Sequence, residues 1–182
     1  MKKSFLLMGS LVALTVAGCG GNDNAASDPN TLVSNDFDTL AGWLPEPQSA
    51  TLTREKAHSG HYSLKVDGTH EYSLGFNALL GQLHETRISK IKVSAWVFVP
   101  SAEAKAALVT AVSTPGAPSD KPLLWESLDL SQTKEINKWI EVSKVVTLPA
   151  NTAPTNALVL YLWRTSGNQP VYLDDLRVTV EP

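Results

Sequence analysis

The stretch KIKVSAWVFV, residues 90–99, places apolar side chains at every second position from Ile91 to Val99. Successive side chains of a β-strand point to opposite faces, so this spacing predicts a strand with one face against a core. Shorter examples of the same period recur along the chain. They are Leu64 and Val66, then Tyr72, Leu74 and Phe76, then residues 140–148, 158–163 and 176–180.

Turn-forming segments separate these predicted strands. They are Asp67-Gly68, Pro100-Ser101, and residues 115–118, 149–151 and 166–168. Many short strands divided in this way are typical of a β-sandwich or a β-barrel. One segment favours a helix: Ser101 could cap the alanine-rich residues up to Ala107, which predicts a turn or two there.

The N-terminus has the pattern of an export signal. Met1-Lys2-Lys3 is basic, the residues from Phe5 to Val16 are almost all apolar, and small residues precede Cys19. The apolar run is shorter than the roughly 20 residues of a membrane span. The segment Val16-Ala17-Gly18-Cys19 resembles the lipobox of bacterial lipoproteins, whose cysteine is lipidated after cleavage of the signal, here residues 1–18.

The alternative is an ordinary signal peptide with an incidental cysteine. Cys19 is the only cysteine of the chain, so it cannot form an intrachain disulfide, and we expect it to be lipidated. Residues 19–30 are small and polar and predict a flexible tether. The expected location is the cell envelope, on the outer membrane, at the cell surface or in the periplasm, with a lipid anchor in the membrane.

Residues 31–182 have the size of one ordinary domain. Loss of Lys2 and Lys3 with the signal leaves 13 of the 15 basic residues against 18 acidic ones, a net charge of −5. The basic residues are also scattered along the sequence. A nucleic-acid surface needs a clustered basic face, so we expect no nucleic-acid partner.

Five segments carry a family resemblance. They are Asn35–Asp38 with Gly42-Trp43, Ala57–Val66, Lys92–Val97, Trp139–Val142 and Val171–Leu176. In this order they resemble the jelly-roll carbohydrate-binding modules, the galactose-binding-like sandwiches found beside bacterial cellulases and xylanases. The resemblance implies an all-β fold, a jelly-roll β-sandwich of two antiparallel sheets. It is less specific for a ligand, because one sandwich can host many functions.

The resemblance also implies one structural calcium ion. Calcium takes six to eight oxygen ligands from carboxylates and backbone carbonyls. Carried onto this sequence, the ligands of the family are Asp38, backbone carbonyls around Gly60, and Asp174 or Asp175. Asp38 stands where glutamate is commoner in the family and is one methylene shorter. The alternative is that these aspartates are surface residues of a turn.

The aromatic residues divide into two groups. Trp43 and Trp139 match positions in the body of the family fold, so we expect them to pack in the core. The second group comprises the candidate ligand-binding residues, namely Tyr72, Trp96, Trp125, Tyr161 and Trp163. Broad aromatic rings stack against the apolar face of a sugar, as they do against one another. Trp96 fits this role least well of the five, because it alternates along its strand with apolar residues that are expected to face a core.

Two polar residues of the xylan-binding relatives are missing. Those relatives carry an arginine in "TGR" after the "SLKV" strand, where this chain has Asp67-Gly68-Thr69. They carry a glutamate in "YxE" before the final loop, where this chain has Tyr161-Leu162-Trp163. Directed hydrogen bonds supply selectivity in such sites. We therefore expect weak binding of sugars, or binding of something else.

The sequence contains no pattern typical of an enzyme. Asp174 and Asp175 are neighbours on a predicted strand and point to opposite faces, so they cannot form the facing carboxylate pair of a glycosidase. The chain has neither a Gly-x-Ser-x-Gly elbow nor a glycine-rich phosphate loop. His58 and His61 lie in a predicted strand and turn and share no helix face, so a zinc site is not expected. We predict a protein without catalytic activity.

Two functions remain. The first is a non-catalytic glycan-binding lipoprotein that holds polysaccharide or oligosaccharide at the envelope. The second is a structural or adhesive lipoprotein that contacts other proteins and binds no sugar. An exposed row of aromatic side chains would favour the first, and aromatic side chains buried under residues 115–122 and 166–170 would favour the second. A lipocalin-like carrier would need a closed barrel, which the resemblance argues against.

Overall fold

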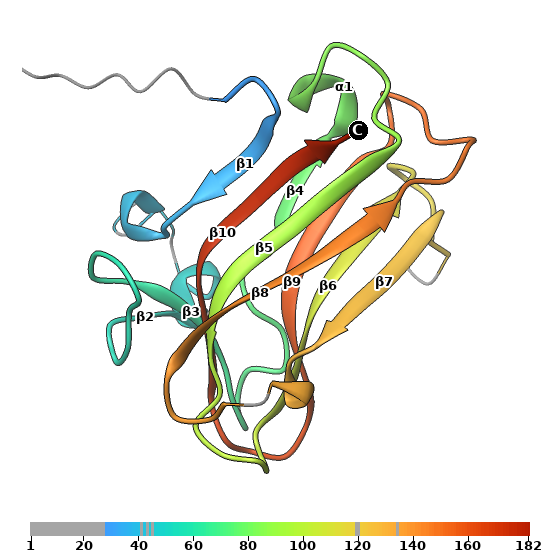
Figure 1. Ribbon diagram of the computed structural model, residues 1–182. Coiled ribbons are helices and arrows are strands. Elements are labelled where there is room, and N and C mark those ends of the chain that lie inside the picture. The colour runs from blue at the N-terminus through green and yellow to red at the C-terminus, as the bar shows by residue number, and fades with distance from the viewer. Residues whose placement is uncertain (1–27, 41, 43, 45, 119–120, 134) are drawn as a thin grey trace, which may run out of the picture.

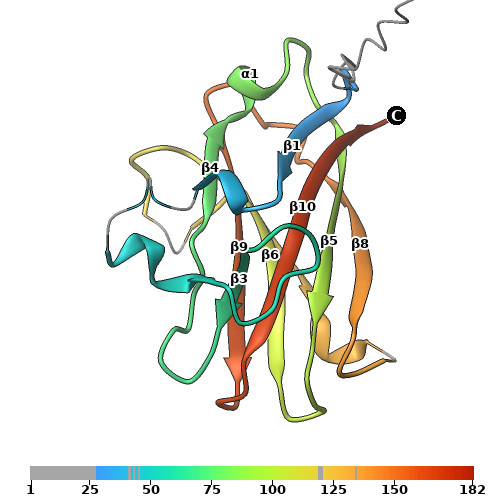
Figure 2. The same cartoon turned by 90° about the vertical axis from the view of Figure 1, so that its left-hand side faces the viewer.

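Two antiparallel sheets make up the folded part of the protein (Figure 1, Figure 2). The computed structural model describes residues 28–40, 42, 44, 46–118, 121–133 and 135–182. The first sheet has six strands in the order β2-β3-β10-β5-β8, with β1 also paired to β10, and the second has four in the order β4-β9-β6-β7. This architecture confirms the predicted jelly-roll β-sandwich.

The strands of the six-stranded sheet are β1 (Thr31–Asn35), β2 (Leu52–Thr53), β3 (Ser63–Val66), β5 (Lys90–Phe98), β8 (Trp139–Thr147) and β10 (Val171–Glu181). The strands of the four-stranded sheet are β4 (Phe76–Leu79), β6 (Lys105–Ser113), β7 (Leu124–Asp129) and β9 (Ala157–Ser166). Helical segments are short: α1 (Leu80–Leu83) and the 3-10 turns η1 (Asp38–Leu40), η2 (Gln48–Thr51) and η3 (Leu130–Gln132). Within the described ranges, no helix has the length and apolar character needed to cross a membrane.

Strand β5 lies in the six-stranded sheet between β10 and the edge strand β8. Its inward residues Ile91, Val93 and Val97 are fully or almost fully buried, whereas Lys90 and Lys92 are exposed. Strand β9 meets it across the core with Leu158, Leu160 and Leu162. The predicted alternation of residues 90–99 and 158–163 is therefore confirmed, and it brings the inner faces of the two sheets together.

The helical turns predicted over Ser101–Ala107 are wrong beyond the first residues. The chain makes one hydrogen-bonded turn, in which the Ala104 N–H donates to the Ser101 carbonyl over 3.2 Å, and β6 then begins at Lys105. Every residue from Ala106 to Val112 is buried. A strand covered on both faces has apolar residues at almost every position and lacks the alternation of a half-exposed strand.

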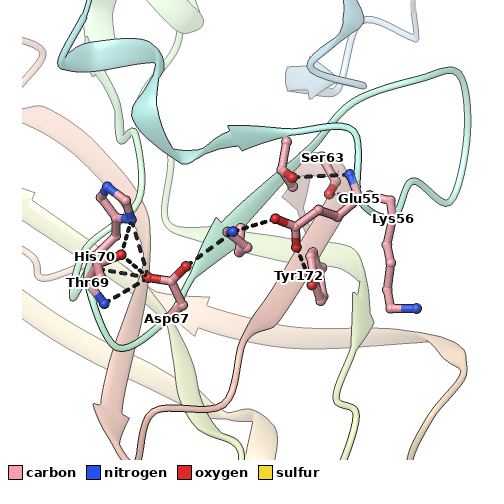
Figure 3. Close-up of polar contacts among 9 residues, drawn as sticks. Glu55, Lys56, Ser63, Asp67, Thr69, His70 and Tyr172 are labelled. Carbon is pink, nitrogen blue, oxygen red and sulfur yellow. Dashed lines mark hydrogen bonds and ion pairs between the residues drawn. The ribbon is translucent and has the colours of Figure 1, made fainter.

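A chain of charged side chains links β3 to β10 at the surface (Figure 3). Lys65 Nζ lies 2.7 Å from Glu55 Oε1 and 3.2 Å from Asp67 Oδ2. The Tyr172 hydroxyl donates to Glu55 Oε2 over 2.7 Å, and hydrogen bonds from Lys65 and Tyr172 lower the pKa of Glu55. These contacts tie the loop before β3 to the strand beside it.

Asp67 also closes the turn that follows β3. Its Oδ1 accepts the backbone N–H of Thr69 over 2.9 Å and of His70 over 3.0 Å, and the Thr69 hydroxyl over 2.7 Å. Burial alone would raise the pKa of Asp67, but the hydrogen bonds from Thr69 and Lys65 outweigh it and hold the pKa far below its usual value. The predicted turn at Asp67-Gly68 is thus built around an ionised carboxylate.

This carboxylate should make stability depend on pH. Its pKa is lower in the folded than in the unfolded chain, so its stabilising effect is full above the unfolded value of about 3.9 and is lost as the pH falls below it. At pH 7 we expect Asp67→Asn to lower the free energy of unfolding by about 1–3 kcal/mol. Urea unfolding at pH 7, 5 and 3 measures this loss. The difference in free energy of unfolding between Asp67→Asn and wild type should become smaller below about pH 4.

Asp28→Asn is the control, because Asp28 is exposed and lies 3.6 Å from Arg177 in an open ion pair. That variant should change the free energy of unfolding by less than about 0.5 kcal/mol at each pH. The free energy of unfolding of Asp67→Asn is compared with that of wild type at each pH. If the difference stayed constant down to pH 3, it would contradict the role given to the Asp67 charge.

Candidate functional site

Four of the predicted ligand-binding residues gather on the outer face of the four-stranded sheet. They are Tyr72, Trp125, Tyr161 and Trp163, called the aromatic platform below. The Tyr72 and Trp163 rings are parallel within 7°, with centroids 6.4 Å apart. Trp125 meets Trp163 edge to face at 6.1 Å, and Tyr72 meets Tyr161 in the same way at 5.9 Å. Residues from β9, from β7 and from the loop before β4 thus form one surface.

The register of three strands explains this arrangement. Leu160 and Leu162 of β9 point into the core, so the alternate residues Tyr161 and Trp163 point outward. The neighbouring strand β6 presents small outward side chains. Its pairings are Ala107 with Trp163, Val109 with Tyr161, and Ala111 with Trp125 of β7. Val109 is 0% exposed although it lies outside the main core cluster, so the large outward side chains beside it cover this strand.

The platform is open on its solvent side. Tyr72 is 54% exposed and Trp125 is 47% exposed. Tyr161 and Trp163 are half-buried between them. Of the two arrangements considered from sequence, the structure shows the exposed aromatic row for these residues.

Polar groups orient the aromatic rings and lie at the border of the platform. The Trp125 indole N–H donates to the Tyr161 hydroxyl over 3.3 Å, and the Trp163 indole N–H donates to Glu71 Oε1 over 3.2 Å. Hydrogen bonds from the Trp163 and Tyr72 side chains lower the pKa of Glu71, which therefore stays ionised near neutral pH. Glu71 did not emerge from the sequence, because nothing there pairs it with a tryptophan 92 positions away.

Trp96 does not belong to this platform, which corrects its inclusion with the other four residues. It lies on β5 in the opposite sheet and stacks on His58, with ring centroids 3.9 Å apart and planes within 11°. Trp139 packs edge to face on Phe98 at 5.7 Å and is half-buried. Trp43 and Cys19 lie outside the described residues.

The four residues predicted as calcium ligands meet around the turn at residues 58–61. Asp174 is 0% exposed, and its carboxylate accepts three backbone N–H groups, from His58 at 2.7 Å, Ser59 at 3.1 Å and Asp175 at 2.8 Å. Burial outweighs these bonds and raises the pKa of Asp174. The Asp175 carboxylate accepts the Ser59 hydroxyl over 2.6 Å and lies 2.6 Å from His58 Nδ1.

Asp38 reaches the same turn from the other side. Both of its carboxylate oxygens accept the His61 N–H, over 2.8 and 3.1 Å. Gly60 has a positive φ of 53°, and a Cβ built there would lie 1.8 Å from Asp38 Oδ2. Glycine is therefore required at this position both for its backbone conformation and for the space that Asp38 occupies.

The carboxylates of the predicted calcium site are engaged by the turn itself. All three carboxylates face N–H or O–H donors of the turn, whereas calcium needs free oxygen ligands. No cluster of three or more His, Cys, Asp or Glu side chains in the described part of the chain is arranged to hold a metal ion. Calcium binding stays a prediction, and thermal unfolding in calcium and in chelator tests it.

Solved structures with a similar fold are carbohydrate-binding modules. One is the C-terminal family 22 module of Clostridium thermocellum Xyn10B, whose cleft residues act in ligand binding. Its sequence is 14% identical to this chain, and the two structures superpose with a TM-score of 0.52. The match covers 84% of this chain and 94% of that chain. The tandem family 22 modules of Paenibacillus barcinonensis Xyn10C are also 14% identical, with 83% and 50% covered and a TM-score of 0.52. The fold is shared with these modules. No family model and no curated protein matches the chain.

The turn at residues 58–61 gives a prediction on stability. Gly60→Ala should lower the free energy of unfolding by about 2–4 kcal/mol, because it adds backbone strain and displaces Asp38 from the His61 N–H. Gly116→Ala is a matched control, since Gly116 has a φ of 81° and nothing within 4 Å of a built Cβ. We expect the control to cost about 1 kcal/mol. Urea unfolding measures both variants. If Gly60→Ala and Gly116→Ala lost the same free energy of unfolding, Asp38 would not restrict position 60.

Proposed function

We propose that this protein is a non-catalytic glycan-binding lipoprotein and that the aromatic platform is its binding face. The observation that carries the proposal is the exposed cluster of four aromatic rings on one sheet of a carbohydrate-binding-module fold. Large aromatic surfaces open to water are unusual on a sheet unless they meet a partner. The apolar face of a sugar ring is a partner that aromatic rings stack against.

Glu71 supplies the hydrogen-bonding group that such a face needs. The xylan-binding relatives place a glutamate at the end of the strand, where this chain has Trp163. Here Glu71 reaches the edge of the same ring from the loop before β4. An ionised carboxylate is a strong acceptor for sugar hydroxyls. The platform therefore combines stacking with a directed contact, although the contact comes from a different part of the chain than in the relatives.

Affinity electrophoresis of the full chain against soluble xylan, β-glucan, mannan and galactan tests the proposal. We expect at least one polysaccharide to slow migration saturably, and Trp163→Ala to weaken that binding about tenfold, the loss of one good stacking contact. Trp139→Phe is the control, because Trp139 lies on β8 of the six-stranded sheet, packs on Phe98, and should leave binding at the platform unchanged.

Thermal unfolding of both variants must accompany this comparison, because Trp163 also covers β6. Binding as tight in Trp163→Ala as in wild type, or no retardation with any of the polysaccharides, would contradict the proposal. The second result would favour the structural or adhesive lipoprotein instead.

The membrane anchor is a separate part of the proposal. It rests on the lipobox-like sequence ending at Cys19, followed by eleven small or polar residues before the folded part. We expect the mature protein to carry covalent lipid and to partition into detergent, and Cys19→Ala to abolish both. Labelling with an alkyne fatty acid followed by mass measurement checks this. An unmodified Cys19 in the mature protein would contradict the anchor without bearing on the binding face.

A further inference from the structure

A pocket lies on the outer face of the six-stranded sheet, opposite the platform. It is an open pocket of about 580 Å³ between β5, β8, β10 and the segment that follows β1. Sites for small ligands usually have volumes of roughly 300–1,000 Å³. We call this region the Trp96 pocket, since Trp96 is the one aromatic residue among the described residues that line it.

The floor of the Trp96 pocket is set by strand register. Trp96 of β5 lies opposite Glu141 of β8, and Ser94 of β5 lies opposite Arg177 of β10. All four side chains point outward, because Val93 and Val97 fill the alternate, buried positions of β5. An indole ring, a carboxylate, a hydroxyl and a guanidinium are thereby placed side by side.

A hydrogen-bonded support holds the aromatic wall in place. Asp175 follows Asp174 at an irregularity of β10, with a positive φ of 48°. This conformation directs its carboxylate to His58 Nδ1 and to the Ser59 hydroxyl, both 2.6 Å away. The His58 ring in turn lies flat on Trp96, 3.9 Å away. The orientation of Trp96 is therefore fixed before any ligand arrives, which reduces the entropy lost on binding.

Other groups in the pocket remain available to a ligand. Within the described residues, neither the Glu141 carboxylate nor the Ser94 hydroxyl has a hydrogen-bond or ion-pair partner. Arg177 donates through Nη2 to the Thr31 hydroxyl, and the same nitrogen lies 3.6 Å from Asp28, so its other N–H groups stay available. Acceptors, donors and a ring edge together match a compact ligand that has several hydroxyl groups and one apolar face.

The charge of the lining limits the ligand further. The lining contains the carboxylates of Asp36, Glu141 and Asp175 and the single guanidinium of Arg177, so it carries a net charge of −2. A uronate or sulfated sugar would bring a like charge into this field and bind more weakly. We propose that the Trp96 pocket binds one neutral sugar unit, as a second site that does not depend on the aromatic platform.

Amide NMR of the full chain can locate this binding. The probes are methyl β-D-xyloside, methyl β-D-glucoside and methyl β-D-galactoside, with D-glucuronate as the charged counterpart. At least one neutral probe should shift the backbone amides of Ser94, Trp96 and Glu141 saturably, and glucuronate should bind at least about fivefold more weakly. Addition of chelator should leave these shifts unchanged.

Variants separate this site from the platform. Glu141→Gln should weaken the neutral probe about tenfold, because a charged acceptor is lost. Ser94→Ala is a second variant in case Glu141→Gln is poorly folded, and it should weaken the same probe severalfold. Trp163→Ala on the platform should leave these shifts intact. Glu135→Gln, at an exposed residue paired with Lys138 over 2.8 Å, should also have no effect.

Three results would overturn the proposal. The first is the absence of shifts at β5 and β8 with every neutral probe, and the second is shifts confined to β7 and β9. The second result would still support the platform, so the two sites fail separately. The third is a response that disappears in chelator, which would identify the pocket as a cation site.

Discussion

Strand β6 is buried on both faces, by the core on one side and by aromatic side chains on the other. Its outward residues Ala107, Val109 and Ala111 are too small to cover the backbone themselves. Neighbouring strands must therefore contribute large side chains, and Tyr161, Trp163 and Trp125 stand at the paired positions. One packing requirement thus gathers these three rings, and Tyr72 completes the surface through its bridge to Trp163.

This arrangement couples stability to binding on the four-stranded sheet. The inner edges of the rings exclude water from β6, while their outer faces remain free for a ligand. Preformed, rigid aromatic surfaces lose little entropy when they bind. The six-stranded sheet differs, because its outer face is polar around Trp96 and depends on hydrogen bonds and on the His58 stack for rigidity. The two faces therefore present different chemistry on one sandwich.

Alternation in the sequence predicted long strands such as β5 and β9, missed the shorter β1, β2 and β7, and failed on the fully buried β6. Residues 90–99 and 158–163 alternate because one side is exposed, whereas β6 is apolar throughout, and its alanines favoured a helix. Alternation also showed that Tyr161 and Trp163 share a face. That Tyr72 and Trp125 join them, that Glu71 bonds Trp163, and that Trp96 lies on the opposite sheet all depend on pairing between distant strands. A single sequence carries no signal for such pairing.

If a glycan lies on the aromatic platform, it must contact Trp125 and Trp163, and the indole N–H resonances of the tryptophans report such contact. Single Trp→Phe variants assign these signals, and a soluble oligosaccharide from the retained polysaccharide is then titrated into the full chain. We expect the Trp125 and Trp163 signals to move saturably, while the Trp139 signal stays fixed. Binding that leaves both platform signals unchanged would contradict a glycan-binding role for the platform.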